Sequence, residues 1–232
     1  MNLERPWHAS YPAGVPHQID TDEFPSIVSV LQASLEKYRD RPAFSNMGKS
    51  LTYAEVDKYS KQFAAYLLGE LKLKKGDRVA IMMPNCLQYP IALFGVLRAG
   101  LTVVNTNPMY TARELKHQLV DSGASAILVF DNFAKIVQDV VSETSVKQVI
   151  TTGLGDLLPF PKGAIVNFVL KYVKKMIPEY DIPGSRLHHA AGHRLPAVHR
   201  RHHRRCQGRD ADPQESGFQH AAIQCMGRRQ HA

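Results

Sequence analysis

Cysteine is scarce in this sequence, with three residues among 232. Because their number is odd and they are scattered, they give no framework for a disulfide-stabilised secreted domain. Long apolar runs are also missing, since no stretch approaches the roughly 20 residues needed to span a bilayer. The first residues, MNLERPWHASYPAGVPHQ, lack the charged and then apolar order of a secretion signal. We therefore expect a cytoplasmic protein.

Lysine is absent from the last part of the chain, although the whole chain has a net charge of +8. Residues 1–185 contain 20 basic and 18 acidic residues, a net of +2, whereas residues 186–232 contain nine arginines and three acidic residues, a net of +6. The basic character therefore belongs to the tail. The body is nearly neutral, and the 44% hydrophobic content of the chain is ample for one core.

The stretch from Lys74 to Val129 organises the chain, because short apolar runs alternate there with helical patterns. Strands are predicted at Arg78–Met83, Leu101–Asn105, Ala126–Phe130 and Lys147–Thr151, and helices at Cys86–Arg98, from Thr111 to about Asp121, and from a capping Asp131 to about Val141. Four strands joined by helices, with right-handed crossovers, predict an α/β fold with a doubly wound parallel sheet.

The residues before this stretch add a short helical and hairpin region. Residues 1–24 form an irregular lead-in, and the apolar spacing of Phe24–Tyr38 predicts an amphipathic helix. Two short strands follow at Arg41–Met47 and Lys49–Tyr53. Thr52 and Glu55 have the spacing of a capping box, which predicts a helix to about residue 71, and Thr111 and Glu114 repeat this pattern later.

The segment Ala164–Met176 is apolar along one side and carries Lys171, Lys174 and Lys175 near its C-terminal end. Two interpretations stay open. It is either an ordinary surface helix, with cations favoured by the helix dipole, or a helix that lies on a membrane surface. The second would make the protein peripheral at the inner membrane face.

Four pieces of the sequence carry a family resemblance: LTYAEV at 51–56, KKGDRVAIMMPNCLQYPIALFGVLRAG at 74–100, VVNTNPMYTARELKHQLVDSGASAILV at 103–129 and VNFVLKYVKKMIPEY at 166–180. From about Trp7 to Asp181 the chain resembles the N-terminal portion of bacterial long-chain fatty acyl-CoA synthetases, which belong to the adenylate-forming superfamily. The resemblance assigns residues 25–184 to the N-terminal part of an AMP-binding domain. Residues 185–232 are then a disordered tail.

The resemblance implies an ATP-, Mg²⁺- and coenzyme A-dependent ligase that converts a long-chain fatty acid to its acyl-CoA through an acyl-adenylate. In that family a Ser/Thr/Gly/Lys-rich loop holds the phosphates, and an acidic residue and a C-terminal lysine act later in the chain. None of these motifs is legible in the sequence. We therefore assign no catalytic, cofactor-binding or metal-binding residue, and expect this chain to be inactive alone and to bind none of these cofactors well.

The tail offers two functional hypotheses as written. His199, His202, His203 and Cys206 are candidate zinc ligands, and the arginines between 200 and 205 could bind nucleic acid. A third interpretation is that this segment is not a selected protein sequence, since it has no apolar period or interleaved aromatic residues. We favour this third interpretation and expect no nucleic-acid partner.

The genetic code provides a test of the third interpretation. When Ala197–Pro213 is back-translated with CGN for arginine and read one base later, each new codon keeps two fixed bases and has a free middle base. The allowed choices give QYTGGTTGVAKGAMLTH, which resembles the phosphate-binding loop of the family. We infer a frameshift, either in the gene or in its sequencing, that begins between about Gly184 and Gly192.

Two further features suggest sites, but neither is convincing as one. Gly153-Leu-Gly155 is too short for a dinucleotide-binding fingerprint. Cys86 lies at a predicted helix start, where the pKa of a thiol can fall, but no histidine is near it in the sequence. We expect a buried structural cysteine.

Overall fold

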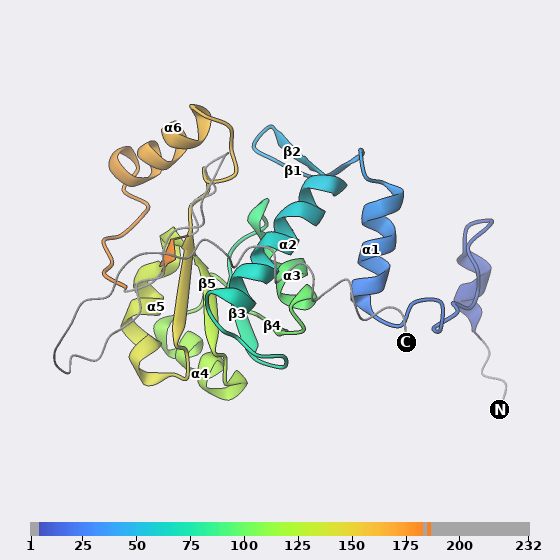
Figure 1. Cartoon of the computed structure of the whole chain (residues 1–232), viewed down its shortest axis with the longest axis horizontal. Helices are drawn as coiled ribbons and strands as arrows, with labels where there is room; N and C mark the ends of the chain where they lie inside the picture. The colour runs from blue at the N-terminus through green and yellow to red at the C-terminus, as the bar shows by residue number, and fades with distance from the viewer. Residues whose placement is uncertain (1–4, 183–184, 187–232) are drawn as a thin grey trace, which may run out of the picture.

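The computed structural model describes residues 5–182 and 185–186, and a parallel sheet lies at its centre (Figure 1). The strands are β3 (Arg78–Met82), β4 (Thr102–Asn105), β5 (Ala126–Phe130), β6 (Gln148–Thr152) and β7 (Ser185–Arg186), in the order β4-β3-β5-β6-β7. All neighbouring strands are parallel. The four predicted strands are confirmed. The fifth, β7, falls in the segment assigned to the tail, and the rest of that segment lies outside the described residues.

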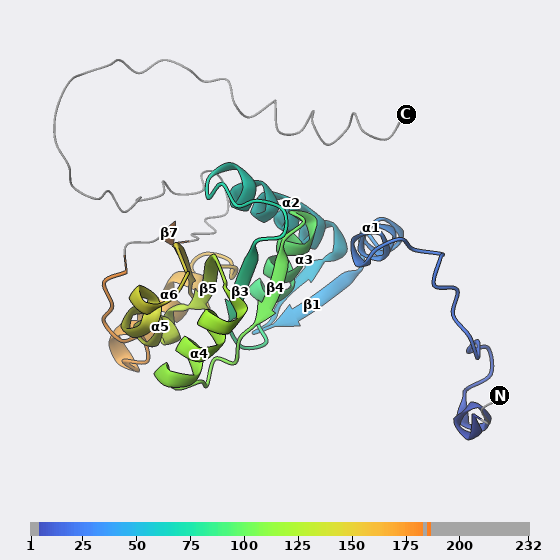
Figure 2. The same cartoon turned by 90° about the horizontal axis from the view of Figure 1, so that it is seen from below.

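Helices cover both faces of the sheet, which confirms the doubly wound arrangement. Figure 2 shows α2 (Tyr53–Gly69) and α3 (Gln88–Arg98) on one side, with α4 (Ala112–Ser122) and α5 (Ala134–Val140) on the other. Short 3-10 turns, η2 (Asp131–Phe133) and η3 (Val141–Glu143), flank α5. The lead-in contains only one 3-10 turn, η1 (Pro6–Ser10), among its described residues.

The sheet separates two hydrophobic cores, because successive side chains of a strand point to opposite faces. In β3, Val79 and Ile81 belong to the core under α1 (Ile27–Lys37), α2 and α3, whereas Ala80 and Met82 belong to the core under α4 and α5. Every residue of β5 is buried. This explains why β5 appears in the sequence as a continuous apolar run.

The first helix begins later than the sequence predicted. α1 spans Ile27–Lys37, and Ser26 caps it, with its hydroxyl accepting the Ser29 amide while the Ser29 side chain accepts the Ser26 amide. Phe24 precedes Pro25, and a residue before proline is disfavoured in helical conformation. The predicted start at Phe24 was therefore wrong, and the serine pair is the signal that was missed.

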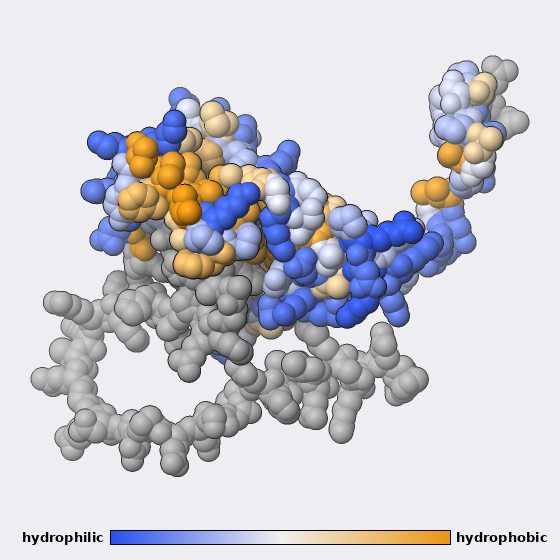
Figure 3. All heavy atoms as spheres, turned by 90° about the horizontal axis from the view of Figure 1, so that it is seen from above, coloured by the Kyte–Doolittle hydropathy of each residue, from blue (hydrophilic) through white to orange (hydrophobic). Residues whose placement is uncertain are grey.

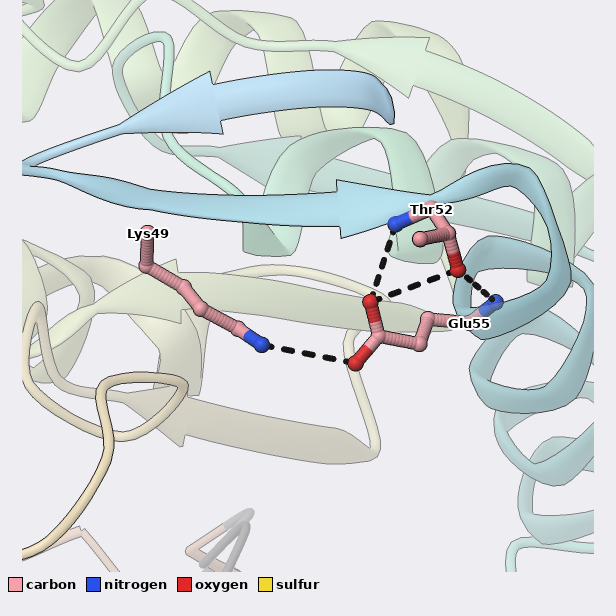
Figure 4. Close-up of polar contacts among 3 residues, drawn as sticks. All are labelled: Lys49, Thr52 and Glu55. Atoms are coloured by element: carbon pink, nitrogen blue, oxygen red, sulfur yellow. Dashed lines mark hydrogen bonds and ion pairs between the residues drawn. The ribbon is translucent and has the colours of Figure 1, made fainter. Parts of the chain in front are cut away.

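The hairpin of β1 (Pro42–Asn46) and β2 (Lys49–Thr52) leads directly into α2 through the predicted capping box (Figure 4). The Thr52 hydroxyl accepts the Glu55 amide at 3.1 Å, and the Glu55 carboxylate accepts the Thr52 amide at 2.9 Å. Lys49 from β2 donates to the other Glu55 oxygen at 3.4 Å. The hydrogen bond that the Thr52 backbone N–H donates to the Glu55 carboxylate is the main reason why the pKa of Glu55 lies below its ordinary value.

The second capping box, Thr111 with Glu114, is also confirmed at the start of α4. The end of that helix agrees as well, because Gly123 takes a left-handed conformation with φ of 59°. By contrast, α3 begins at Gln88 and not at Cys86. Cys86 and Leu87 are buried in the link before it.

The segment after β6 forms α6 (Lys162–Phe168), which continues as one π-helical turn, η4 (Val169–Val173). The predicted helix at Ala164–Met176 is confirmed in position, although it begins two residues earlier and ends three residues earlier. α6 lies beyond one end of the sheet, on the same side as the tip of the β1–β2 hairpin (Figure 1). Lys162 donates to the Met47 carbonyl at that tip. None of the helices in the described ranges is long and apolar enough to cross a bilayer.

Candidate functional site

The strand order places a topological switch point between β3 and β5. The connection after β3 leads through α3 to β4 on one side, and the connection after β5 leads through α5 to β6 on the other. In open α/β sheets, ligands bind in the crevice beyond the carboxyl ends of the strands at such a point. The residues that follow β3, β5 and β6 therefore form the candidate site, which we call the carboxyl-end site.

The loop after β6 is fixed to the neighbouring connection by hydrogen bonds. Gln88, at the start of α3, is buried and donates to the Gly153 carbonyl at 2.8 Å. The Asp156 carboxylate accepts the Gly153 amide at 2.7 Å and the Thr152 hydroxyl at 3.2 Å. These hydrogen bonds hold the loop against the switch point, and they fix its backbone conformation by contacts within the chain alone.

The same loop holds α6 by an unusually close backbone contact. A β-carbon added at Gly155 would lie 2.2 Å from the Gly163 carbonyl oxygen, and one added at Gly163 would lie 2.4 Å from the Gly155 carbonyl oxygen. Asn167, one turn further along α6, accepts the Gly155 amide at 2.8 Å and donates to Asp156 at 2.9 Å. The glycines at 153 and 155 therefore serve packing, a role that was not predicted from the sequence. The spacing of Gly163 and Asn167 on one helix face was the available signal.

Asp131 follows β5 directly, at the centre of the carboxyl-end site. Its side chain is completely buried and accepts the Tyr180 hydroxyl at 2.9 Å. The prediction that Asp131 caps the next helix was wrong, because α5 begins three residues later, at Ala134, with Phe133 in the cap position. The carboxylate is used instead to hold the segment after η4 against the sheet. Asp181 continues this contact, since its amide donates to Gln138 on α5.

An open cleft of about 930 Å³ lies between this segment and η4. Its lining combines apolar and polar side chains, including Asp131, Asn167, Lys171, Tyr172 and Tyr180. Within the described ranges no three histidine, cysteine, aspartate or glutamate residues are grouped to hold a metal ion. The cleft thus offers shape and hydrogen-bonding groups.

Cys86 is a structural residue. Its side chain is 8% exposed, and its sulfur lies 3.7 Å from the Met83 sulfur. Burial raises the pKa of the Cys86 thiol above its ordinary value, although two backbone amides partly oppose this shift. A buried thiol with a raised pKa is a poor nucleophile at neutral pH, and the expectation that Cys86 is buried is confirmed.

The remaining sequence hypotheses fall in two places. Lys171, Lys174 and Lys175 lie in and just after η4, and all three are exposed. The candidate zinc ligands His199, His202, His203 and Cys206, the arginines between 200 and 205, and the out-of-frame phosphate loop at Ala197–Pro213 all lie outside the described residues.

Comparison with known proteins gives a family and a set of relatives. Residues 31–205 match the AMP-binding enzyme family. The chain is 52% identical over 183 residues to a long-chain-fatty-acid–CoA ligase of Escherichia coli O6:H1, an alignment that covers 79% of this chain and 33% of the relative. It is 53% identical over 181 residues to the ligase of the same name from Haemophilus influenzae, covering 78% of this chain and 32% of the relative. The chain therefore spans about a third of the length of these relatives.

Solved structures agree with the fold. A long-chain-fatty-acid–CoA ligase of Archaeoglobus fulgidus is similar with a TM-score of 0.52 and 26% identity, covering 61% of this chain and 29% of that one. An anthranilate–CoA ligase in complex with anthranoyl-AMP is similar with a TM-score of 0.53, covering 56% of this chain and 25% of that one. At 18% identity this second likeness concerns the fold alone.

Proposed function

Because the chain belongs to the AMP-binding enzyme family, we propose that it is the N-terminal part of a long-chain-fatty-acid–CoA ligase. The observation that carries this proposal is the identity of 52% over 183 residues to a ligase of that name. The relatives are named as ligases, which favours this function over a stand-alone module that binds fatty acid or a membrane surface.

The reaction proposed for the intact ligase has two steps. The fatty carboxylate attacks the α-phosphorus of ATP and displaces pyrophosphate, which gives an acyl-adenylate. The thiol of coenzyme A then attacks the acyl carbon and displaces AMP. Mg²⁺ would neutralise phosphate charge in the first step, and hydrogen-bond donors of a phosphate loop would stabilise the charge that develops there.

The described part would act as scaffold in this reaction. The carboxyl-end site presents the Gln88–Gly153 contact and the buried Asp131 at the switch point. We propose residues 25–184 as the N-terminal part of the AMP-binding domain. The residues that bind ATP and coenzyme A lie outside this part, so the 232-residue chain has no ligase activity alone.

We further propose that a one-base frame change accounts for the tail. Its start, between Gly184 and Gly192, is supported by the phosphate-loop sequence that the offset frame allows for Ala197–Pro213. The match to the AMP-binding enzyme family extends to residue 205, beyond the proposed start of the frame change. The boundary of that match therefore does not locate the change. Sequencing the DNA across codons 180–200 would locate the frame change. If neither one-base offset of that DNA encodes YTGGTTG, the proposal is wrong.

The functional test compares two proteins. One is the 232-residue chain, and the other is expressed from a gene in which one base has been removed between codons 184 and 192 and translation continues in the restored frame over the length of the relatives. Fatty-acid-dependent exchange of pyrophosphate into ATP measures the first step. We expect exchange only in the restored protein. Exchange by the 232-residue chain would overturn the assignment of the ATP site to later residues, and no exchange by a folded restored protein would overturn the ligase proposal.

We also propose a cytoplasmic location with contact at the inner face of the membrane. The exposed Lys171, Lys174 and Lys175, which lie in and just after η4, support this contact.

A further inference from the structure

The segment of residues 176–182, which we call the strap, lies between η4 and β7 in the chain. Side chains of η2 and α5, which follow β5, hold the strap by three hydrogen bonds. Asn132 donates to the Met176 carbonyl at 3.1 Å, Asp131 accepts the Tyr180 hydroxyl at 2.9 Å, and Gln138 accepts the Asp181 amide at 3.0 Å. Tyr180 and Ile182 also pack against the core under α4 and α5. The strap is therefore fixed to the body from its first residue to its last.

The helical segment before the strap contributes little to its position. In η4, Tyr172 and Val173 are 60% and 63% exposed in this chain. Figure 3 shows hydrophobic side chains gathered on the surface at this end of the molecule. Because η4 buries little of its apolar side here, the position of the strap depends mainly on the strap's own hydrogen bonds and core contacts.

The strand after the strap decides where the chain leaves the sheet. β7 pairs with β6 through two residues only, Ser185 opposite Ile150 and Arg186 opposite Thr151. Because the two strands are parallel, β7 leads the chain toward the carboxyl end of β6, where the carboxyl-end site lies. Two residue pairs are a weak anchor, since they must offset the backbone freedom that the paired residues lose. The strap therefore supplies much of the fixation that β7 itself lacks.

We propose that Asp131 and Tyr180 are positioning residues for the phosphates of ATP. The inference rests on the proposed ligase function, in which the phosphate loop, at Ala197–Pro213 in the offset frame, follows β7 in the chain. Asp131 is completely buried and acts through Tyr180. By fixing the strap, the pair fixes the direction in which β7 brings the chain to the carboxyl-end site. Such placement matters, because a displacement of about 1 Å caused far from the chemistry can cost roughly 100-fold in rate.

The first experiment measures hydrogen exchange of backbone amides in the 232-residue protein. Tyr180→Phe removes the hydroxyl that Asp131 accepts and keeps the ring that packs on the core. A buried hydrogen bond contributes on the order of a factor of 10. The Asp181 amide should therefore exchange roughly 10-fold faster, because local opening of the strap breaks its bond to Gln138.

The matched control is Tyr89→Phe. It also removes a tyrosine hydroxyl, which donates to the Asn105 side chain at 3.0 Å, but Asn105 ends β4 at the opposite edge of the sheet. This variant should leave hydrogen exchange at Asp181 as in the parent.

The second experiment measures pyrophosphate exchange by the frame-restored protein. The double variant Tyr180→Phe with Gln138→Ala removes two of the three hydrogen bonds of the strap. It should raise the KM for ATP by up to roughly 100-fold, because only molecules with the strap in place present the phosphate loop correctly. The change in kcat should be smaller. The KM for fatty acid is the internal control and should not change, and neither KM should change in Tyr89→Phe.

Three results would overturn the inference. The first is unchanged hydrogen exchange at Asp181 in Tyr180→Phe. The second is an equal acceleration at the amides of β5, which would mean a general loss of stability. The third is a double variant that keeps the parent's KM for ATP, or one in which both KM values rise equally.

Failure of the ligase proposal gives a different result. A restored parent without pyrophosphate exchange would overturn the ligase proposal together with the role given to the strap. An active restored parent with an unaffected double variant would overturn the role of the strap alone. Hydrogen exchange at Asp181 requires no activity and is measured in either case.

Discussion

The capping box between the hairpin and α2 gives the most direct stability prediction. Thr52→Ala removes the oxygen that accepts the Glu55 amide at 3.1 Å. The loss of such a cap lowers the free energy of unfolding by about 1 kcal/mol, within a range of about 0.5–2 kcal/mol. In a domain of about 150–250 residues, 1 kcal/mol corresponds to a decrease in Tm of roughly 2–4 °C.

Glu55→Gln tests the charge of the same box. Glutamine can still accept the Thr52 amide, so the substitution removes the negative charge near the helix N-terminus, which is worth about 0.3–1 kcal/mol. The hydrogen bond from the Thr52 backbone N–H, together with the positive charge of Lys49, keeps the folded-state pKa of Glu55 below its ordinary value of 4.5. The stabilisation by ionised Glu55 is therefore fully present above the unfolded-state pKa and is lost as pH falls through the folded-state pKa.

The assay is urea unfolding followed by far-ultraviolet circular dichroism, at pH 7 and at several values below 4.5. The difference in the free energy of unfolding between the parent and the Glu55→Gln variant should shrink as pH falls. At pH 7 the same Glu55→Gln substitution should cost less in a protein that already carries Thr52→Ala. The loss of stability in Thr52→Ala is compared with that in Thr111→Ala. In this second capping box the Glu114 amide lies 3.5 Å from the Thr111 oxygen, a longer contact than the 3.1 Å in the first box. If the parent and the Glu55→Gln variant differ equally at all pH values, the ionised carboxylate has no role.

Three further outcomes are expected. Gly163→Ala should lower the free energy of unfolding by about 1–3 kcal/mol, because the new methyl group meets a backbone oxygen at 2.4 Å; Gly69→Ala, at a site with nothing within 4 Å, should have no such effect on the urea midpoint. Asp57→Ala should cost about 3–5 kcal/mol, since Arg98, whose side chain is 7% exposed, would lose its ion-pair partner; unfolding near the parent midpoint would contradict this. Cys86 should react with a thiol reagent more slowly in the folded protein than in urea, measured after the other two cysteines are replaced by serine, and equal rates would show that its burial does not protect it.

Much of the fold was predictable because local signals agreed with one another. The strands β3 to β6 are short apolar runs between turn residues, and both threonine capping boxes form as their spacing predicts. The start of α1 was not predicted, because a serine at the third helical position can replace the usual glutamate. Local patterns also could not place Asp131, whose position is decided by Tyr180, 49 residues later in the chain.

Which side of α6 faces the body depends on tertiary contacts that no local sequence pattern shows. Its apolar spacing predicts a helix equally well whichever side faces the core. The choice rests on Gly155 and Gly163, whose backbones approach each other closely, and on Asn167, which completes the contact. The phosphate loop is a different case, because its proposed signal lies in the codons and not in the residues of Ala197–Pro213.

The alternation of β3 between two cores also limits how this domain can change in evolution. One inserted or deleted residue inside the strand would move Val79 and Ile81 to the side that now holds Ala80 and Met82. Both cores would then receive side chains of the wrong volume at once. Substitutions can be compensated one neighbour at a time, but a change of length cannot. We expect natural variants of this region to differ in length only in the loops at the strand ends.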